Sequence, residues 1–149
     1  MFFLFLKETI NIMDIIYSSE PPTIEKYFPL FESTGWNVKY KLTTEELNSI
    51  VSKSYFTVSA YNGEILVGFG RIVSDGILHA MIYEMIIHPK YQLNGIGSEI
   101  LKMLLKKCKD DNIRDIQLFC AKGKRAFYEK FGFTARPDDA PGMQYQPKT

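Results

Sequence analysis

The stretch Gln92-Leu93-Asn94-Gly95-Ile96-Gly97 decides how this 149-residue chain is interpreted. It stands between an apolar segment that ends at His88-Pro89 and an amphipathic segment at residues 95–109. Glycines remove side chains where the backbone could approach a ligand, and the first turn of a helix presents unpaired N–H groups and the positive end of the helix dipole. The stretch therefore predicts an anion site made from main chain at a strand-to-helix junction.

Two other phosphate-binding motifs do not fit this stretch. A Walker A loop requires Gly-Lys-Ser/Thr, but Ser98 and Glu99 follow Gly97. A dinucleotide fingerprint needs Gly or Ala where Ile100 stands, and no parallel strand–helix–strand unit precedes the stretch. A tight turn that carries glycines but binds no ligand stays open as the alternative.

Helical and strand periodicities surround the junction. The helices are expected at residues 23–31, 43–52, 95–109 and 123–131. The strands are expected at residues 55–61, 64–73, 78–87 and 113–120, with a final pair between 133 and 145. Asn62-Gly63 predicts a hairpin between the first two strands, and the strand at 113–120 is expected to be buried. The order predicts an α/β (α+β) fold, with a mixed, mostly antiparallel central sheet flanked by helices.

Composition and charge exclude several classes of protein. The net charge is +1, whereas a nucleic-acid binder needs a cationic surface, so no nucleic-acid partner is expected. Two cysteines and two histidines are too few for a cysteine cage or a catalytic metal, so no metal is expected. The same cysteine count favours a reducing, cytoplasmic setting.

The chain begins with a short apolar run. This run, residues 2–6, ends at Lys7-Glu8 and is too short for a signal peptide or a spanning helix, so no membrane partner is expected. Residues 1–12 are interpreted as an N-terminal extension or an upstream start. Residues 13–149 are then a single domain.

Three motifs together resemble the GNAT superfamily of N-acetyltransferases. The stretch at residues 92–97 fits the Q/R-x-x-G-x-G/A pattern, residues 85–89 match the strand end and proline before it, and residues 127–133 match F-Y-x-x-x-G-F. The resemblance covers essentially residues 14–149. Trp36 and the tail at residues 136–143 also make the chain similar to a bacterial branch related to plastid serotonin N-acetyltransferases.

The resemblance implies an acyl-CoA N-acyltransferase fold and acetyl-CoA as co-substrate. It implies a splay of the third strand that frees its main chain to bind the cofactor, and the residues expected to do so are Met85, Ile86, Ile87, Gln92, Leu93, Asn94, Gly95, Ile96, Gly97 and Ser98. Many members also carry an asparagine about seven residues before the signature tyrosine. Ala121 stands there, so any cofactor contact at that position must come from other groups.

The reaction needs an acid and a base, because a primary amine is mostly charged at neutral pH and the leaving thiolate must be protonated. The resemblance implies that Tyr128 is the general acid; an ordinary core aromatic is the alternative. Glu84 interrupts an otherwise apolar strand and is the candidate base, although a water relay could carry the proton instead. His88 could also serve, but a surface or capping role at the mouth of the loop is favoured.

The function that follows is an acetyl-CoA-dependent N-acetyltransferase in which a primary amine attacks directly within a ternary complex. Trp36 is a candidate wall of the acceptor site, and a small-molecule amine is favoured over a protein amine. The family also makes a homodimer plausible. One alternative is an RNA-binding module, since residues 67–73 superficially resemble an aromatic RNA-binding strand. The other is a catalytically silent acyl-CoA-binding sensor.

Overall fold

The structure, a computed structural model, describes residues 14–147. The N-terminal extension expected at residues 1–12 lies outside the described residues. The chain divides into two compact units, the first ending at Gln117 and the second beginning at Leu118. The first unit contains most of the sheet, and the second contains the last helix and the C-terminal segment.

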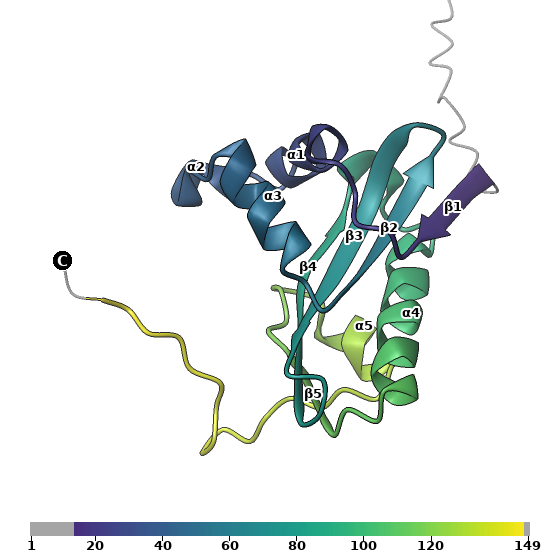
Figure 1. The fold of residues 1–149 in the computed structure, drawn as a ribbon. Helices are drawn as coiled ribbons and strands as arrows, with labels where there is room; N and C mark the ends of the chain where they lie inside the picture. The colour runs from purple at the N-terminus through teal and green to yellow at the C-terminus, as the bar shows by residue number, and fades with distance from the viewer. Residues whose placement is uncertain (1–13, 148–149) are drawn as a thin grey trace, which may run out of the picture. The chain divides into compact units, whose positions relative to one another are not determined.

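A five-stranded sheet organises the first unit (Figure 1). Its strands follow chain order and span Ile15–Ser18 (β1), Phe56–Asn62 (β2), Ile65–Ser74 (β3), His79–Ile87 (β4) and Asp115–Leu118 (β5). The pairings from β1 to β4 are antiparallel, and β2 and β3 form the hairpin expected at Asn62-Gly63. The expected sheet class is confirmed. β1 was not expected, because an edge strand of four residues is too short to show a periodicity.

Three of the helices confirm the expectation and lie close to the expected bounds, and α5 occupies the middle of its expected range. The helices span Ile24–Glu32 (α1), Asn37–Tyr40 (α2), Thr44–Ser52 (α3), Ile96–Asp110 (α4) and Arg125–Glu129 (α5). A capping box begins α3, because the Thr43 hydroxyl accepts from the Glu46 N–H while the Glu46 carboxylate accepts from the Thr43 N–H. α2 was not expected, since its four residues follow Gly35 and carry no apolar period.

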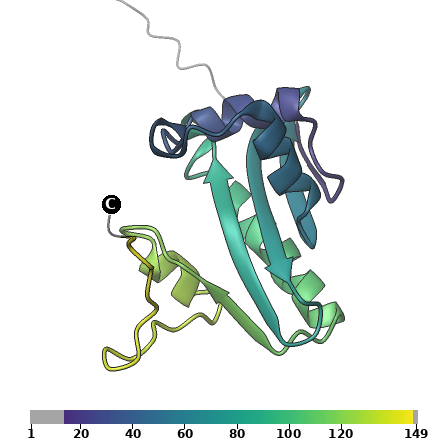
Figure 2. The same cartoon turned by 60° about the vertical axis from the view of Figure 1, so that its left-hand side comes forward.

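The two faces of the sheet are covered by different helices (Figures 1 and 2). Alternate residues of a strand point to opposite faces. Phe69 packs in a core with Tyr27 of α1 and Ile86 of β4, so α1 covers that face. On the other face, Gly68 and Gly70 lie directly against side chains of α4. These two glycines let α4 pack closely against the sheet. Because Ile96, the first residue of α4, contacts Gly68, this packing also positions the first turn of the helix.

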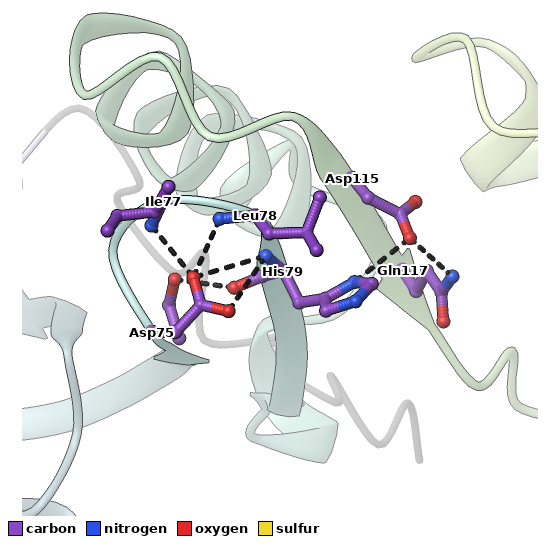
Figure 3. A network of polar contacts seen from close by, with 7 residues as sticks. Asp75, Ile77, Leu78, His79, Asp115 and Gln117 are labelled. Atoms are coloured by element: carbon purple, nitrogen blue, oxygen red, sulfur yellow. Dashed lines mark hydrogen bonds and ion pairs between the residues drawn. The ribbon is translucent and has the colours of Figure 1, made fainter.

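β5 is joined to the beginning of β4 by a polar network (Figure 3). The Asp115 N–H donates to the Leu78 carbonyl (2.7 Å), and His79 Nδ1 lies 3.1 Å from Asp115 Oδ2. Asp75 closes the turn before β4, since its carboxylate accepts from the N–H groups of Ile77 and Leu78, both at 2.7 Å. β4 and β5 therefore meet where both strands begin.

Two expectations for the second half of the chain are wrong. β5 is half-buried rather than buried and spans only Asp115–Leu118. Residues 133–147 contain no strand, although a pair was expected there. Pro137 and Pro141 lack the N–H that a sheet ladder needs, and this segment instead closes a turn in which the Ala140 N–H donates to the Pro137 carbonyl (2.9 Å).

Within residues 14–147, none of the helices has the length and apolar character needed to cross a membrane.

Candidate active site

A bulge interrupts β4 at Glu84. Ile86 pairs with Phe69 of β3 and Tyr83 pairs with Arg71, so two residues of β4 oppose the single residue Gly70. Glu84 adopts φ of +46°, a backbone conformation that is uncommon outside glycine. The bulge lies one residue before Met85 to Ile87, where the family resemblance implied a splay; the splay itself stays a prediction.

The bulge places Glu84 beside a cation. Its Oε2 atom pairs with Nε of Arg71, and the two side chains are 21% and 13% exposed, respectively. The Arg71 guanidinium also lies over the Tyr83 ring, 5.6 Å from its centroid. The carboxylate that stood out in the sequence as a charge in an apolar strand therefore has a partner. Its role as base stays a prediction.

At the end of β4, which stays paired with β3, the main-chain groups of Ile87 point away from β3. The His88 N–H donates to the Val67 carbonyl (2.8 Å). Because successive residues of an antiparallel strand bond to opposite sides, Ile86 bonds toward β3 and the Ile87 N–H and carbonyl point the other way. The Ile87 carbonyl accepts from Gln92 Nε2 at 3.1 Å, which is consistent with this orientation.

Hydrogen bonds between its own side chains and main chain stabilise the loop between β4 and α4. His88 caps the short 3₁₀ turn Pro89–Tyr91, since its Nδ1 accepts from the Lys90 N–H at 3.1 Å, and this confirms the capping role expected for it. Asn94 Nδ2 donates to the Tyr91 and Gln92 carbonyls, both at 3.1 Å. Gln92 and Asn94 thus shape the loop from within.

The first turn of α4 has no side-chain cap. Its N-cap is Gly95, with φ of +79°, and the Glu99 N–H is already bonded to the Gly95 carbonyl. The N–H groups of the intervening residues 96–98 precede the first intrahelical bond. The Ile96 side chain is buried in the core, whereas Leu93 in the loop is fully exposed. The groups at the start of α4 that could bind an anion are therefore main-chain N–H groups, not side chains.

Tyr128 lies in the second unit, on α5. Its ring packs edge-on against Phe127 (centroids 5.0 Å apart) and Phe133 (5.9 Å), and the Phe133 N–H donates to the Tyr128 carbonyl. The three aromatic residues of the sequence motif thus form one cluster. Burial raises the pKa of the Tyr128 hydroxyl, and the neighbouring Cys120 raises it further.

Trp36 caps the beginning of α2. Its ring packs edge-on against Phe31 of α1, with centroids 6.0 Å apart, and 42% of the residue is exposed. The exposed part could line a ligand site, while the contact with Phe31 shows that the ring also packs between helices. Val38 and Tyr40 on the same short helix are exposed as well.

No group of three or more His, Cys, Asp or Glu side chains that could hold a metal ion occurs in the part of the chain that the structure describes.

The sequence alone does not single out Arg71, the partner of Glu84, or Tyr27, which packs on the same sheet face. No sequence signal assigns a role to Arg71, because its pairing with Glu84 depends on the register of β3 against β4. Tyr27 looked like any other apolar position of α1, because no sequence signal separates a tyrosine used for its ring from one used for its hydroxyl.

The bulged β4, the glycine-capped α4 and helices on both sheet faces define an acyltransferase of the N-acyltransferase fold. The model of the "Acetyltransferase (GNAT) domain" family matches residues 29–141. The chain belongs to the GNAT family of acetyltransferases. The RNA-binding interpretation of residues 67–73 is therefore wrong: this segment is the middle of β3, where glycines make room for α4.

Similar proteins carry acetyltransferase names. The "Uncharacterized N-acetyltransferase ycf52" of Pyropia yezoensis is 33% identical over 138 residues, which cover 89% of this chain and 78% of that protein. "GCN5-related N-acetyltransferase 2, chloroplastic" of Arabidopsis thaliana is 32% identical over 83 residues, covering 56% of this chain and 32% of that protein. The solved "Probable Acetyltransferase" SA2161 of Staphylococcus aureus has a TM-score of 0.77 at 26% identity, covering 89% of this chain and 99% of that chain. These comparisons support the likeness to plastid members.

Proposed function

We propose that this acetyltransferase moves the acetyl group of acetyl-CoA to a primary amine, and that the amine attacks the thioester directly while both substrates are bound. The observation that carries the proposal is the start of α4, where Gly95 provides no side-chain cap and leaves the first N–H groups of the helix to an anion. A pyrophosphate suits these donors, and membership in the GNAT family supports acetyl-CoA as its source.

The cofactor-binding groups in this proposal are mostly main chain. The N–H groups of residues 95–98 bind the pyrophosphate, with Gln92, Leu93 and Asn94 forming the loop around it. The main chain of residues 85–87 lies along the pantetheine arm. The Ile87 N–H, which points away from β3, donates to the thioester carbonyl and polarises it.

Tyr128 and Glu84 share the proton transfers. Tyr128 protonates the leaving thiolate; its phenol carries the proton at neutral pH, and burial, which raises its pKa, keeps it protonated until the thiolate forms. Glu84 accepts the proton that the ammonium group loses, directly or through water. Arg71 donates a hydrogen bond to Oε2 of Glu84, so the Oε1 atom is the one that binds the amino group of the acceptor substrate.

The acceptor is a small-molecule amine in this proposal, with the exposed part of Trp36 as one wall of its site. An aromatic wall suits an arylalkylamine. The homodimer, the cytoplasmic setting and the likeness to serotonin acetyltransferases stay predictions.

The test combines binding with turnover. Acetyl-CoA should raise the melting temperature of the full chain, because a ligand that binds only the folded state stabilises it. A panel containing tryptamine, spermidine and lysine, assayed by free-thiol release, should then contain an acceptor. Absence of a melting shift at saturating acetyl-CoA would overturn the donor assignment. A shift without thiol release from any amine would favour the acyl-CoA-binding sensor.

The acid role has its own variant. Tyr128→Phe should lower kcat by roughly 100-fold, the lower end of what a positioned general acid contributes. The affinity for acetyl-CoA should stay within about twofold, since the ring and its packing are kept. Tyr145→Phe is the matched control, because Tyr145 is 85% exposed in the same unit, and it should leave turnover unchanged. Equal turnover of Tyr128→Phe and the wild type would remove the acid role.

A further inference from the structure

Tyr27 carries a buried hydroxyl with no partner. The residue is 1% exposed, and its ring packs against Phe69 (centroids 4.7 Å apart) and Phe31 (5.9 Å). Among residues 14–147, no group forms a hydrogen bond with its hydroxyl. A buried hydroxyl without a hydrogen bond destabilises the folded chain, so such groups are rare and need an explanation. The ring alone explains the packing, since a phenylalanine would fill the same space.

Tyr27 packs on the sheet face that also carries Arg71 of the Arg71–Glu84 pair. α1 packs on β3 and β4, and Phe69 and Arg71 are alternate residues of β3 that point to the face covered by α1. Burial raises the pKa of the Tyr27 hydroxyl well above its usual range; the Glu84 carboxylate raises it further, and Arg71 opposes this effect. Both charged groups therefore act on the hydroxyl, which keeps its proton and is available as a donor.

The Glu84 carboxylate has room for this donor. An ionised carboxylate offers about four acceptor positions on its two oxygens. Arg71 takes one of them at Oε2. An acceptor's amino group and the Tyr27 hydroxyl can therefore both bind the same carboxylate.

We infer that Tyr27 is a positioning residue for Glu84: when the acceptor's amino group binds, the Tyr27 hydroxyl donates a hydrogen bond to the Glu84 carboxylate. The inference rests on the proposed function, in which Glu84 receives the amino group. The hydroxyl, unpartnered in the free protein, gains its partner in the acceptor complex. Tyr27 thereby fixes the carboxylate from the core side, while Arg71 fixes it along the sheet.

The variant Tyr27→Phe removes the hydroxyl and keeps the ring. Its kcat/KM for the amine that the wild type acetylates fastest should fall about tenfold, as expected for a lost hydrogen bond to a charged group. The KM for acetyl-CoA should stay within about twofold, because the hydroxyl acts only on the acceptor side. The melting temperature should rise or stay equal, since the free protein loses an unsatisfied polar group.

Ser59→Ala is the matched control. Ser59 is fully buried on β2, one strand further from β4 than β3, and its hydroxyl is the other buried one without a partner in the described chain. Its removal should likewise not lower the melting temperature and should leave both kinetic constants unchanged. A loss of turnover in Tyr27→Phe but not in Ser59→Ala supports the positioning role.

Three results would overturn the inference. The first is an unchanged kcat/KM for the amine in Tyr27→Phe when the wild type is active. The second is a lower melting temperature of that variant, because this would reveal a structural partner for the hydroxyl. The third is a wild type that acetylates no amine, which overturns the proposed function and the inference with it. The first two leave the proposed function standing.

Discussion

The placement of α4 depends on Gly68, and the substitution Gly68→Ala tests it. A Cβ atom at this position would lie 2.9 Å from Ile100 Cδ1, 3.0 Å from Ile96 Cγ2 and 3.2 Å from Ile87 Cδ1. Favourable contacts between carbon atoms are about 3.5–4.0 Å long. All three neighbours belong to the packed contact between the sheet and α4, so the added methyl group must push the helix away from β3.

The expected loss follows from overpacking of a well-packed core. Gly68→Ala should lower the free energy of unfolding by about 2 kcal/mol, within the range of about 1–3 kcal/mol for added methyl groups. For a chain of this size, this corresponds to a fall of roughly 4–8 °C in melting temperature. Because Ile96 is the first residue of α4, the shift also displaces the loop amides, and acetyl-CoA should bind several-fold more weakly.

Thermal denaturation and calorimetric titration with acetyl-CoA measure the two effects. The double variant Gly68→Ala/Ile100→Val is the control, because valine lacks the Cδ1 atom that lies nearest the added methyl group. Ile100→Val alone should cost about 0.5–1.5 kcal/mol. The double variant should therefore lose less stability than the sum of the two single changes. Strict additivity, or an unchanged stability of Gly68→Ala, would refute this account of the helix–sheet contact.

Two further predictions concern charged groups of the first unit. The N–H groups of Ile77 and Leu78 lower the pKa of Asp75, so its stabilising effect exists above the unfolded pKa of about 3.9 and disappears as the pH falls through the lower folded value. Asp75→Ala should therefore melt below the wild type at pH 7, and a difference that persisted near pH 2 would contradict this. Arg71→Met leaves Glu84 unpaired in a site where its side chain is only 21% exposed, and should lower the free energy of unfolding in urea by about 1–3 kcal/mol, the cost of leaving a buried polar group without its partner. An unchanged urea midpoint would show that the pair contributes nothing.

The sequence indicates most of the sheet and helices because their signals are local. The amphipathic period of α4 spans 15 residues, and the turn at Asn62-Gly63 has the residues that a tight hairpin requires. β1 and α2 carry too few residues for a period to show. The strands expected between 133 and 145 are absent for another reason: a sheet ladder needs N–H donors, which Pro137 and Pro141 lack.

The candidate site also contains some features with a local sequence signal and others that depend on the three-dimensional packing. The loop at residues 92–97 is recognisable because Gly95 and Gly97 are separated by a single residue directly before a helical period. The Arg71–Glu84 pair depends on a bulge that shifts the register of β4 by one residue, which alternation alone does not reveal. The unpartnered state of the Tyr27 hydroxyl depends on the full packing of α1 against the sheet.

The central claim is that main-chain N–H groups at the start of α4 bind the pyrophosphate of acetyl-CoA. Amide NMR of the full chain, titrated with coenzyme A and separately with pantetheine, tests it most directly. Coenzyme A should shift the amide resonances of residues 95–98 strongly, and pantetheine, which lacks the pyrophosphate, should leave them in place. Saturable binding of coenzyme A without any shift of these amides would contradict the claim.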